Sequence, residues 1–217
     1  RIWKDYDFVL YFRNSLGVTL VAVLISLVAS TLTGYGATRF NFRGKNTFLS
    51  FILMTQMFPS IMLLVPFYKI LSVYGLNNSL VGLCIVYVSF TIPFCSWMMV
   101  GYFRTIPTEI DESAAIDGAS HLQTFWKIAL PLVKPGLVSS AIYAFITCWN
   151  EYMFAAILLV NDKLKTAAVA IAEMNGYYKI AWNDMMAASL VASVPLIIAF
   201  VFMQKSFISG LTAGAVK

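Results

Sequence analysis

The chain has 217 residues, of which 60% are hydrophobic and 12% are charged. Soluble domains carry about 45–50% apolar and about 25% charged residues. A water-soluble chain of this length could not hide so much apolar surface, so the composition predicts a protein that lies in lipid. The net charge of +5 does not indicate nucleic-acid binding, because the basic residues form no stripe. They stand at the ends of apolar runs, where membrane phosphates are the expected counter-charge.

Five stretches are long and apolar enough to cross a bilayer as helices, which takes about 20 residues each. None of them alternates apolar with polar residues, so strands are not expected. The sequence predicts an all-α, polytopic transmembrane helical bundle that forms one domain over residues 1–217. The predicted spans are Arg13–Arg39, Asn46–Tyr68, Ser79–Phe103, Gly136–Val160 and Met185–Gln204.

The three cysteines, Cys84, Cys95 and Cys148, all fall within these apolar stretches. We interpret them as small buried hydrophobic residues rather than as a disulfide framework. No His or carboxylate stands at ligand spacing around them, so a metal site is not expected.

Two polar connections interrupt the apolar pattern, at residues 104–135 and 161–184. With five spans, eight basic residues would lie on one side of the membrane and seven on the other. This difference is too small for the positive-inside rule to assign the cytoplasmic side. The orientation therefore depends on what the longer connection does.

The longer connection is predicted to form two short helices outside the bilayer. Thr108 is expected to be the N-cap of the first helix, with Asp111 in a capping-box-like position. Gly118 is expected to end this helix, and Ser120 with Gln123 to begin the second. Small side chains on the first helix suit insertion into a groove on a partner, although the helix could also rest on lipid headgroups. The acidic first turn argues against anionic lipid.

The same segment resembles the EAA loop of the permease subunits of bacterial ABC importers. That loop has the pattern Glu-Ala-Ala-x3-Gly-x9-Ile-x-Leu-Pro, and only Ser113 departs from it, as a residue of similar size. The matching positions are Glu112, Ser113, Ala114, Gly118, Ile128, Leu130 and Pro131. Three further runs resemble the carbohydrate branch of these permeases, most of all the maltodextrin-type permeases. They are Ile116–Ala119, which includes Asp117, Trp149–Tyr152 and Gly210–Gly214.

The resemblance implies a type I permease fold that usually has six spans, so one amino-terminal span would be absent from this chain. It implies that the EAA helix docks onto a nucleotide-binding subunit, with Glu112 facing a basic residue, Ala114 keeping the helix thin and Gly118 allowing the turn. Residues 104–135 would then be cytoplasmic and residues 161–184 extracytoplasmic. The expected location is the bacterial cytoplasmic (inner) membrane, with several passes.

The resemblance also implies the partners. These are membrane lipid, a homologous second permease, two ATPase subunits and an extracytoplasmic solute-binding protein. ATP and Mg²⁺ would bind to the ATPase, because this chain has no phosphate-binding loop and needs no cofactor of its own. No catalytic residue is expected either, since His121 is the single histidine. Asn175, Gly176 and Tyr177 are candidates for contact with the binding protein.

The candidate substrate path is Trp149, Asn150, Glu151 and Tyr152, because Glu151 is the one carboxylate inside a predicted span. The aromatic residues could stack on sugar faces. They could equally belong to an interfacial belt, with Glu151 as a structural hydrogen-bonding residue.

The expected function is half of a sugar or oligosaccharide path, driven by ATP hydrolysis on a separate subunit. A permease for glycerol phosphate or a polyol is the nearest alternative. An ATP-independent secondary transporter is less consistent with one intramembrane carboxylate and no internal repeat.

Overall fold

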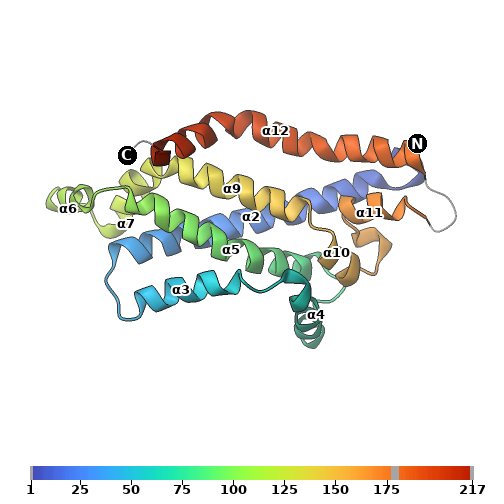
Figure 1. Cartoon of the computed structure of the whole chain (residues 1–217), viewed down its shortest axis with the longest axis horizontal. Coiled ribbons are helices and arrows are strands. Elements are labelled where there is room, and N and C mark those ends of the chain that lie inside the picture. Colours follow the sequence, from blue (N-terminus) through green and yellow to red (C-terminus); the bar gives the residue numbers. More distant parts are fainter. Residues whose placement is uncertain (1, 177–180, 216–217) are drawn as a thin grey trace.

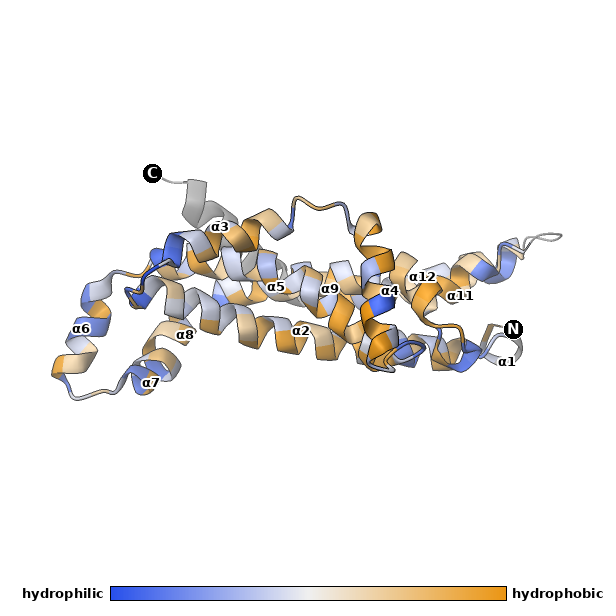
Figure 2. Cartoon of the chain, turned by 90° about the horizontal axis from the view of Figure 1, so that it is seen from below, coloured by the Kyte–Doolittle hydropathy of each residue, from blue (hydrophilic) through white to orange (hydrophobic). Residues whose placement is uncertain are grey.

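The computed structural model describes residues 2–176 and 181–215. Within these ranges the chain forms helices and no strand, which confirms the predicted all-α class. The helices lie along one another in an elongated bundle, with α1 near one end and the last turns of α12 near the other (Figure 1). Hydrophobic residues follow the length of the helices, and hydrophilic residues gather towards the ends of the bundle (Figure 2).

The bounds of the helices show where the bundle is continuous and where it is interrupted. The longer helices are α2 (Phe8–Arg39), α5 (Leu80–Arg104), α9 (Lys134–Trp149) and α12 (Trp182–Ala215). The shorter α-helices are α1 (Ile2–Asp5), α3 (Lys45–Thr55), α4 (Leu64–Val73), α6 (Thr108–Ile116), α7 (His121–Thr124), α8 (Leu130–Leu132), α10 (Met153–Leu158) and α11 (Ala167–Glu173). The 3₁₀ turns are η1 (Ser60–Leu63) and η3 (Asp162–Leu164), and η2 (Phe125–Ala129) is a π-helical turn.

Three helices of the described part are long and apolar enough to cross a membrane: Phe8–Arg39, Leu80–Arg104 and Trp182–Val201. Two bent pairs raise this number to five if each pair is one span. The first pair, Lys45–Thr55 and Ser60–Val73, is bent by 94°, and the second, His121–Leu132 and Lys134–Trp149, by 74°.

The predicted fourth span, Gly136–Val160, is wrong as one continuous helix. Helix α9 ends at Trp149, three residues follow without helical structure, and α10 is a separate short helix. The carboxylate of Glu151 accepts hydrogen bonds from the backbone of α10, which stabilises the interruption. Hydropathy alone does not reveal this break, because apolar residues continue on both sides of it.

Other span boundaries differ less from the prediction. Helix α2 begins at Phe8, so Arg13 lies inside it, and α12 begins at Trp182. The second span is interrupted at residues 56–59, where Pro59 lacks the backbone donor that a continuous helix needs. By contrast, Pro93 lies within α5, which continues past it.

Helices α2 and α5 pack together more extensively than any other pair of described elements. In their buried contact, the Ser26 and Thr91 hydroxyl oxygens are 2.6 Å apart and share a hydrogen bond. Nearer the end that carries α6, Gly34 lies against Met99, so closely that a Cβ atom at Gly34 would be 2.8 Å from Met99 Cβ. Small and polar residues at this interface allow the two backbones to approach, as in other membrane bundles.

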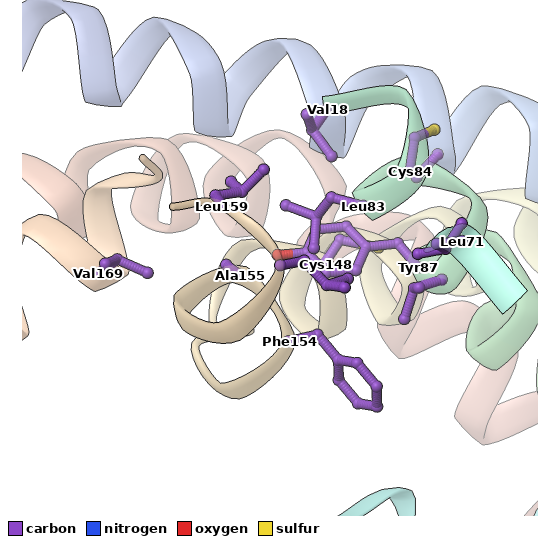
Figure 3. Packing of buried hydrophobic residues seen from close by; sticks show 13 residues of the cluster. Val18, Leu71, Leu83, Cys84, Tyr87, Cys148, Phe154, Ala155, Leu159 and Val169 are labelled. Atoms are coloured by element: carbon purple, nitrogen blue, oxygen red, sulfur yellow. The ribbon is translucent and has the colours of Figure 1, made fainter. Parts of the chain in front are cut away.

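A buried apolar cluster lies towards the opposite end of the bundle, around α10 (Figure 3). It joins residues of α2, α4, α5, α9, α10 and α11, including Val18, Leu83, Cys148 and Phe154. The cysteines Cys84, Cys95 and Cys148 are free and buried, as their apolar surroundings predict.

The close approach at Gly34 generates a prediction about stability. Replacing Gly34 with Ala should destabilise the bundle by about 1–3 kcal/mol, because the added methyl group overpacks the contact with Met99. Gly36→Ala is the matched control, since no atom lies within 4 Å of a Cβ atom built there. The measurement is the thermal unfolding midpoint of each purified variant in detergent. Equal midpoints for the two variants would contradict the packing described for α2 and α5.

Candidate functional site

The polar connection between α5 and α9 forms short helices at one end of the bundle (Figure 1). The expected N-cap at Thr108 is wrong: Pro107 precedes the helix, Thr108 is its first residue, and no side chain caps it. Asp111 does not complete a capping box, because its carboxylate is paired with Arg39 instead.

The turn after α6 follows the prediction. Gly118 has φ of +82°, in the left-handed region that glycine enters without steric strain. The next helix begins with the predicted capping box, in which the Ser120 hydroxyl accepts from the Gln123 amide and the Gln123 side chain accepts from the Ser120 amide. The spacing of Gly118, Ser120 and Gln123 in the sequence therefore predicted the turn and the start of the next helix correctly.

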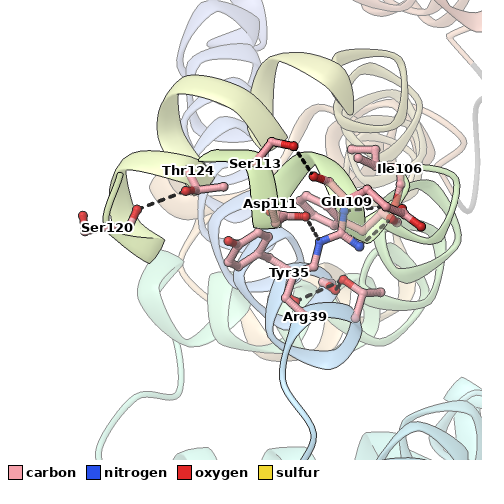
Figure 4. A network of polar contacts seen from close by, with 11 residues as sticks. Tyr35, Arg39, Ile106, Glu109, Asp111, Ser113, Ser120 and Thr124 are labelled. Atoms are coloured by element: carbon pink, nitrogen blue, oxygen red, sulfur yellow. Dashed lines mark hydrogen bonds and ion pairs between the residues drawn. The ribbon is translucent and has the colours of Figure 1, made fainter. Parts of the chain in front are cut away.

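Arg39, the last residue of α2, ties α6 to the membrane helices (Figure 4). Its Nε lies 2.7 Å from Asp111 Oδ2, with the Arg39 side chain 7% and the Asp111 side chain 20% exposed. The same guanidinium donates to the carbonyl oxygens of Phe103, at 3.4 Å, and Ile106, at 3.1 Å. One cation thus joins α2, the carboxyl end of α5 and α6.

An aromatic cluster packs beside this ion pair. The Tyr35 ring contacts the rings of Phe103 and Phe125 edge to face, with centroids 5.6 Å and 4.9 Å away. Phe125 and Ala129 of η2 are buried in the same cluster. The helices that follow Gly118 are therefore fixed to the bundle by apolar packing, while the ion pair with Arg39 ties α6 to α2.

The residues matched to the EAA pattern divide into two groups. Glu112, Ser113, Asp117, Gly118 and Pro131 are exposed at the end of the bundle. Ala114 is 5% exposed and packs inward, and Ile128 and Leu130 are half-buried. Ala114 therefore contributes little to the exposed surface of α6, and its part in coupling stays a prediction. The outward apolar residues near Glu112 are instead Ile116 and Leu122, which are 87% and 67% exposed.

A second feature lies where two breaks in the membrane helices meet. A cavity of about 320 Å³ is lined by residues of the break between α3 and η1 and by residues at the break between α9 and α10. Its polar lining residues include Gln56, Tyr143, Thr147 and Glu151.

Glu151 is held at the cavity by three hydrogen bonds. Its Oε1 accepts from the Phe154 amide at 2.8 Å, and its Oε2 accepts from the Ala155 amide at 3.1 Å and from the Tyr87 hydroxyl at 3.1 Å. The carboxylate therefore caps α10 and links it to α5. This arrangement agrees with the alternative in which Glu151 is a structural hydrogen-bonding residue.

The other candidates for the substrate path lie elsewhere. Trp149 is 6% exposed, and its indole donates to the Ala192 carbonyl of α12 at 3.0 Å. Its ring stacks on Phe145 and meets Phe12 edge to face, so it packs in the bundle. Asn150 and Tyr152 are exposed and are not among the cavity residues.

The connection at residues 161–184 is fastened to the start of α2. The Asn14 amide donates to the carbonyls of Lys163 and Lys165, and the Ser15 hydroxyl accepts from the Ala167 amide. Lys165 pairs with Asp162 and Glu173 at 2.6 and 2.7 Å. Burial lowers the pKa of Lys165, but hydrogen bonds from its ammonium to these carboxylates outweigh that effect and raise the pKa above its usual value.

The candidates for binding-protein contact follow α11 in this connection. Asn175 and Gly176 are exposed there. Tyr177 lies outside the described residues.

Sequence reasoning missed Arg39, Gln56 and Tyr143 as site residues. Each becomes visible only when segments distant in the sequence meet, and no spacing within one segment predicts this.

Among the described residues, no group of three or more His, Cys, Asp or Glu side chains could hold a metal ion.

Comparison with known proteins identifies the family. Residues 22–212 match the binding-protein-dependent transport system inner membrane component family. The whole chain is 37% identical to the trehalose/maltose transport system permease protein MalG of Thermococcus litoralis, covering 79% of that protein. It is 36% identical over its whole length to the maltodextrin transport system permease protein MdxG of Bacillus subtilis, covering 78% of it.

A solved structure of a bacterial ABC transporter involved in the import of the acidic polysaccharide alginate contains a similar chain. The two chains are 25% identical and superpose with a TM-score of 0.80, over 95% of this chain and 78% of the other. Together with the apolar helices and the loop at residues 104–135, these matches show that the chain belongs to the family of inner-membrane permease components of binding-protein-dependent ABC transport systems.

Proposed function

We propose that this permease forms half of the membrane path for a neutral sugar or oligosaccharide, and that α6 couples the path to ATP hydrolysis on a separate subunit. The observation that carries the coupling is the way α6 is presented. It projects from the end of the bundle with Glu112 and Ile116 exposed, while Arg39 and Asp111 hold its base. Such a short, firmly held helix suits a groove on a partner.

The partners follow from this arrangement and from the family. A homologous second permease would complete the path, two ATPase subunits would receive the α6 helices, and an extracytoplasmic binding protein would deliver the cargo. ATP and Mg²⁺ would bind to the ATPase subunits rather than to this chain. Residues 104–135 would be cytoplasmic, and the connection at residues 161–184 would face the binding protein.

A sugar cargo is supported by two independent observations. The relatives described above are named for transport of trehalose, maltose and maltodextrin. The residues that line the cavity include no Lys, Arg or His, so nothing there would neutralise a phosphate group. This lining disfavours glycerol phosphate.

Substitution of Gly118 tests the proposed coupling. Gly118→Val should insert into the membrane but lose ATPase retention or binding-protein-stimulated uptake of labelled maltose or trehalose in proteoliposomes. A β-branched residue at a left-handed position costs about 1–2 kcal/mol and would displace α6. Gly75→Val is the matched control, because Gly75 also has positive φ, of +67°, but lies between α4 and α5. Normal ATPase retention, stimulated turnover and uptake in Gly118→Val would rule out coupling through this turn.

Cysteine labelling tests the proposed orientation. A cysteine at Lys163 should react with a membrane-impermeant thiol reagent added outside intact cells, whereas a cysteine at Lys127 should react only after the cells are opened. Both positions are exposed, and the native cysteines are buried and should contribute little background. Labelling of the Lys127 position from outside would reverse the proposed topology.

A further inference from the structure

Helices α2 and α5 leave a groove beside their contact. The groove has a volume of about 910 Å³, runs along residues 13–25 of α2 and 80–92 of α5, and has mainly aliphatic walls. It opens to the outside of the bundle, because Val21 and Ile85 in its walls are 50% and 44% exposed. Gly17 widens it, since a Cβ atom built there would meet no atom within 4 Å. An apolar groove on the outer surface of a membrane bundle is open to lipid chains or to another helix.

The length of the groove favours a lipid chain over a helix. Each of its two walls rises by about 18 Å at 1.5 Å per residue. One leaflet provides about 15 Å, which is half of a hydrocarbon core of about 30 Å. The groove ends beside Ser26 and Thr91, where the two helices are in direct contact through a shared hydrogen bond. A membrane-spanning helix would need a groove that continues through both leaflets, whereas an acyl chain needs only one.

One end of the groove lies at the level of the membrane surface. Asn14, which follows Arg13, donates to the carbonyl oxygens of Lys163 and Lys165 in the polar connection at residues 161–184. A second, smaller hollow of about 210 Å³ adjoins the groove at Arg13 and is also lined by Trp3, which is 50% exposed. Basic and aromatic side chains are typical of the headgroup region. The groove therefore runs from the headgroup region towards the middle of the bilayer.

The charges at this end indicate which headgroup fits. Arg13 lines both the groove and the smaller hollow, and Asp7 lines the hollow further out. Both side chains are exposed, and neither makes a hydrogen bond or an ion pair within the part of the chain that the structure describes. A guanidinium is well suited to bind phosphate, since it offers several donors in one plane. The carboxylate of Asp7 repels a second anion and attracts an ammonium group, so the pair complements a zwitterion.

We propose that this groove binds one phospholipid with a zwitterionic headgroup that carries a primary amine. The phosphate binds to Arg13, the ammonium group lies towards Asp7, and one acyl chain lies between α2 and α5. The bound chain would fill the half of the α2–α5 interface that the two helices do not close by themselves. This site goes beyond the proposed function, because it needs neither the cargo nor the ATPase. With the proposed orientation, the lipid belongs to the extracytoplasmic leaflet.

The first experiment locates the acyl chain by cross-linking. The assembled importer is placed in vesicles of phosphatidylethanolamine and phosphatidylglycerol, with a trace of phosphatidylethanolamine that carries a photoreactive acyl chain. We expect cross-links to the groove segments of α2 and α5. Val21→Trp should lower this yield at least fivefold, because the indole fills the groove. Leu24→Trp is the control, since Leu24 is 64% exposed on α2 but does not line the groove, and it should stay within twofold of the wild type. Equal yields from the two variants would overturn the site.

The second experiment tests the headgroup with photoreactive phosphatidylethanolamine and phosphatidylglycerol used separately. The wild type should give at least a fivefold higher yield with phosphatidylethanolamine. Arg13→Gln should lower that yield at least fivefold, and Arg13→Lys should restore at least half of it. Lys69→Gln removes an exposed base of α4 that lines neither hollow, and should have no effect.

Replacement of the carboxylate completes the headgroup test. Asp7→Asn should raise the yield with phosphatidylglycerol to that with phosphatidylethanolamine, without harm to α2, because the Asp7 side chain does not cap that helix. Equal yields with both lipids in the wild type, or an unchanged yield in Arg13→Gln, would overturn the proposed headgroup recognition.

The third experiment identifies the occupant in intact cells. The variant Ile85→benzoylphenylalanine places a photoreactive side chain in the groove of the assembled importer. We expect its adduct to be a phospholipid, identified by mass. An adduct with another protein chain would show that a partner helix covers the groove, and would overturn the proposal. None of the three experiments measures transport, so their failure would leave the proposed function standing, and a failure of sugar uptake would leave the lipid site standing.

Discussion

The arrangement of this permease depends on one guanidinium at the end of its first long helix. Arg39 is almost fully buried, pairs with Asp111 of α6 and donates to two carbonyl oxygens near the end of α5. Removing one partner of a buried ion pair costs about 3–5 kcal/mol, because the other charge is left uncompensated. The position of α6 is therefore tied to that of α2 and α5, which are themselves the most extensively packed helices of the bundle.

This connection gives the proposed coupling a physical route. A movement of α6 against an ATPase would act on α2 and α5 through Arg39, and on η2 through the cluster around Tyr35 and Phe125. Tyr87 of α5 in turn donates to Glu151, which caps α10 beside the cavity. A continuous series of packed and hydrogen-bonded elements thus joins the loop to the cavity at the break between α9 and α10.

Features set by neighbouring residues could be predicted from the sequence. The turn at Gly118 and the capping box of Ser120 with Gln123 follow from local rules, and composition predicts the membrane bundle. The helix break at Glu151 and the pairing of Asp111 with Arg39 could not be predicted. The break could not be predicted because apolar residues continue on both sides of Glu151. The ion pair could not be predicted because the spacing of Thr108 and Asp111 indicated a local helix cap instead. Trp149 shows the same limit, because its type suggested sugar stacking while its neighbours place it in the core.

The most direct test of this account is a double-mutant cycle on Arg39→Gln and Asp111→Asn, with sugar uptake per ATP hydrolysed as the readout in proteoliposomes. Arg104→Gln is the control, since Arg104 is an exposed base at the end of α5. The account predicts that each single change lowers this ratio and that the double variant is no worse than Arg39→Gln alone, because both changes break the same ion pair. Two results would contradict the claim that this ion pair couples α6 to the membrane helices. One is that the losses in the ratio from Arg39→Gln and Asp111→Asn add up in the double variant. The other is that the ratio is unchanged in both single variants and in the double variant.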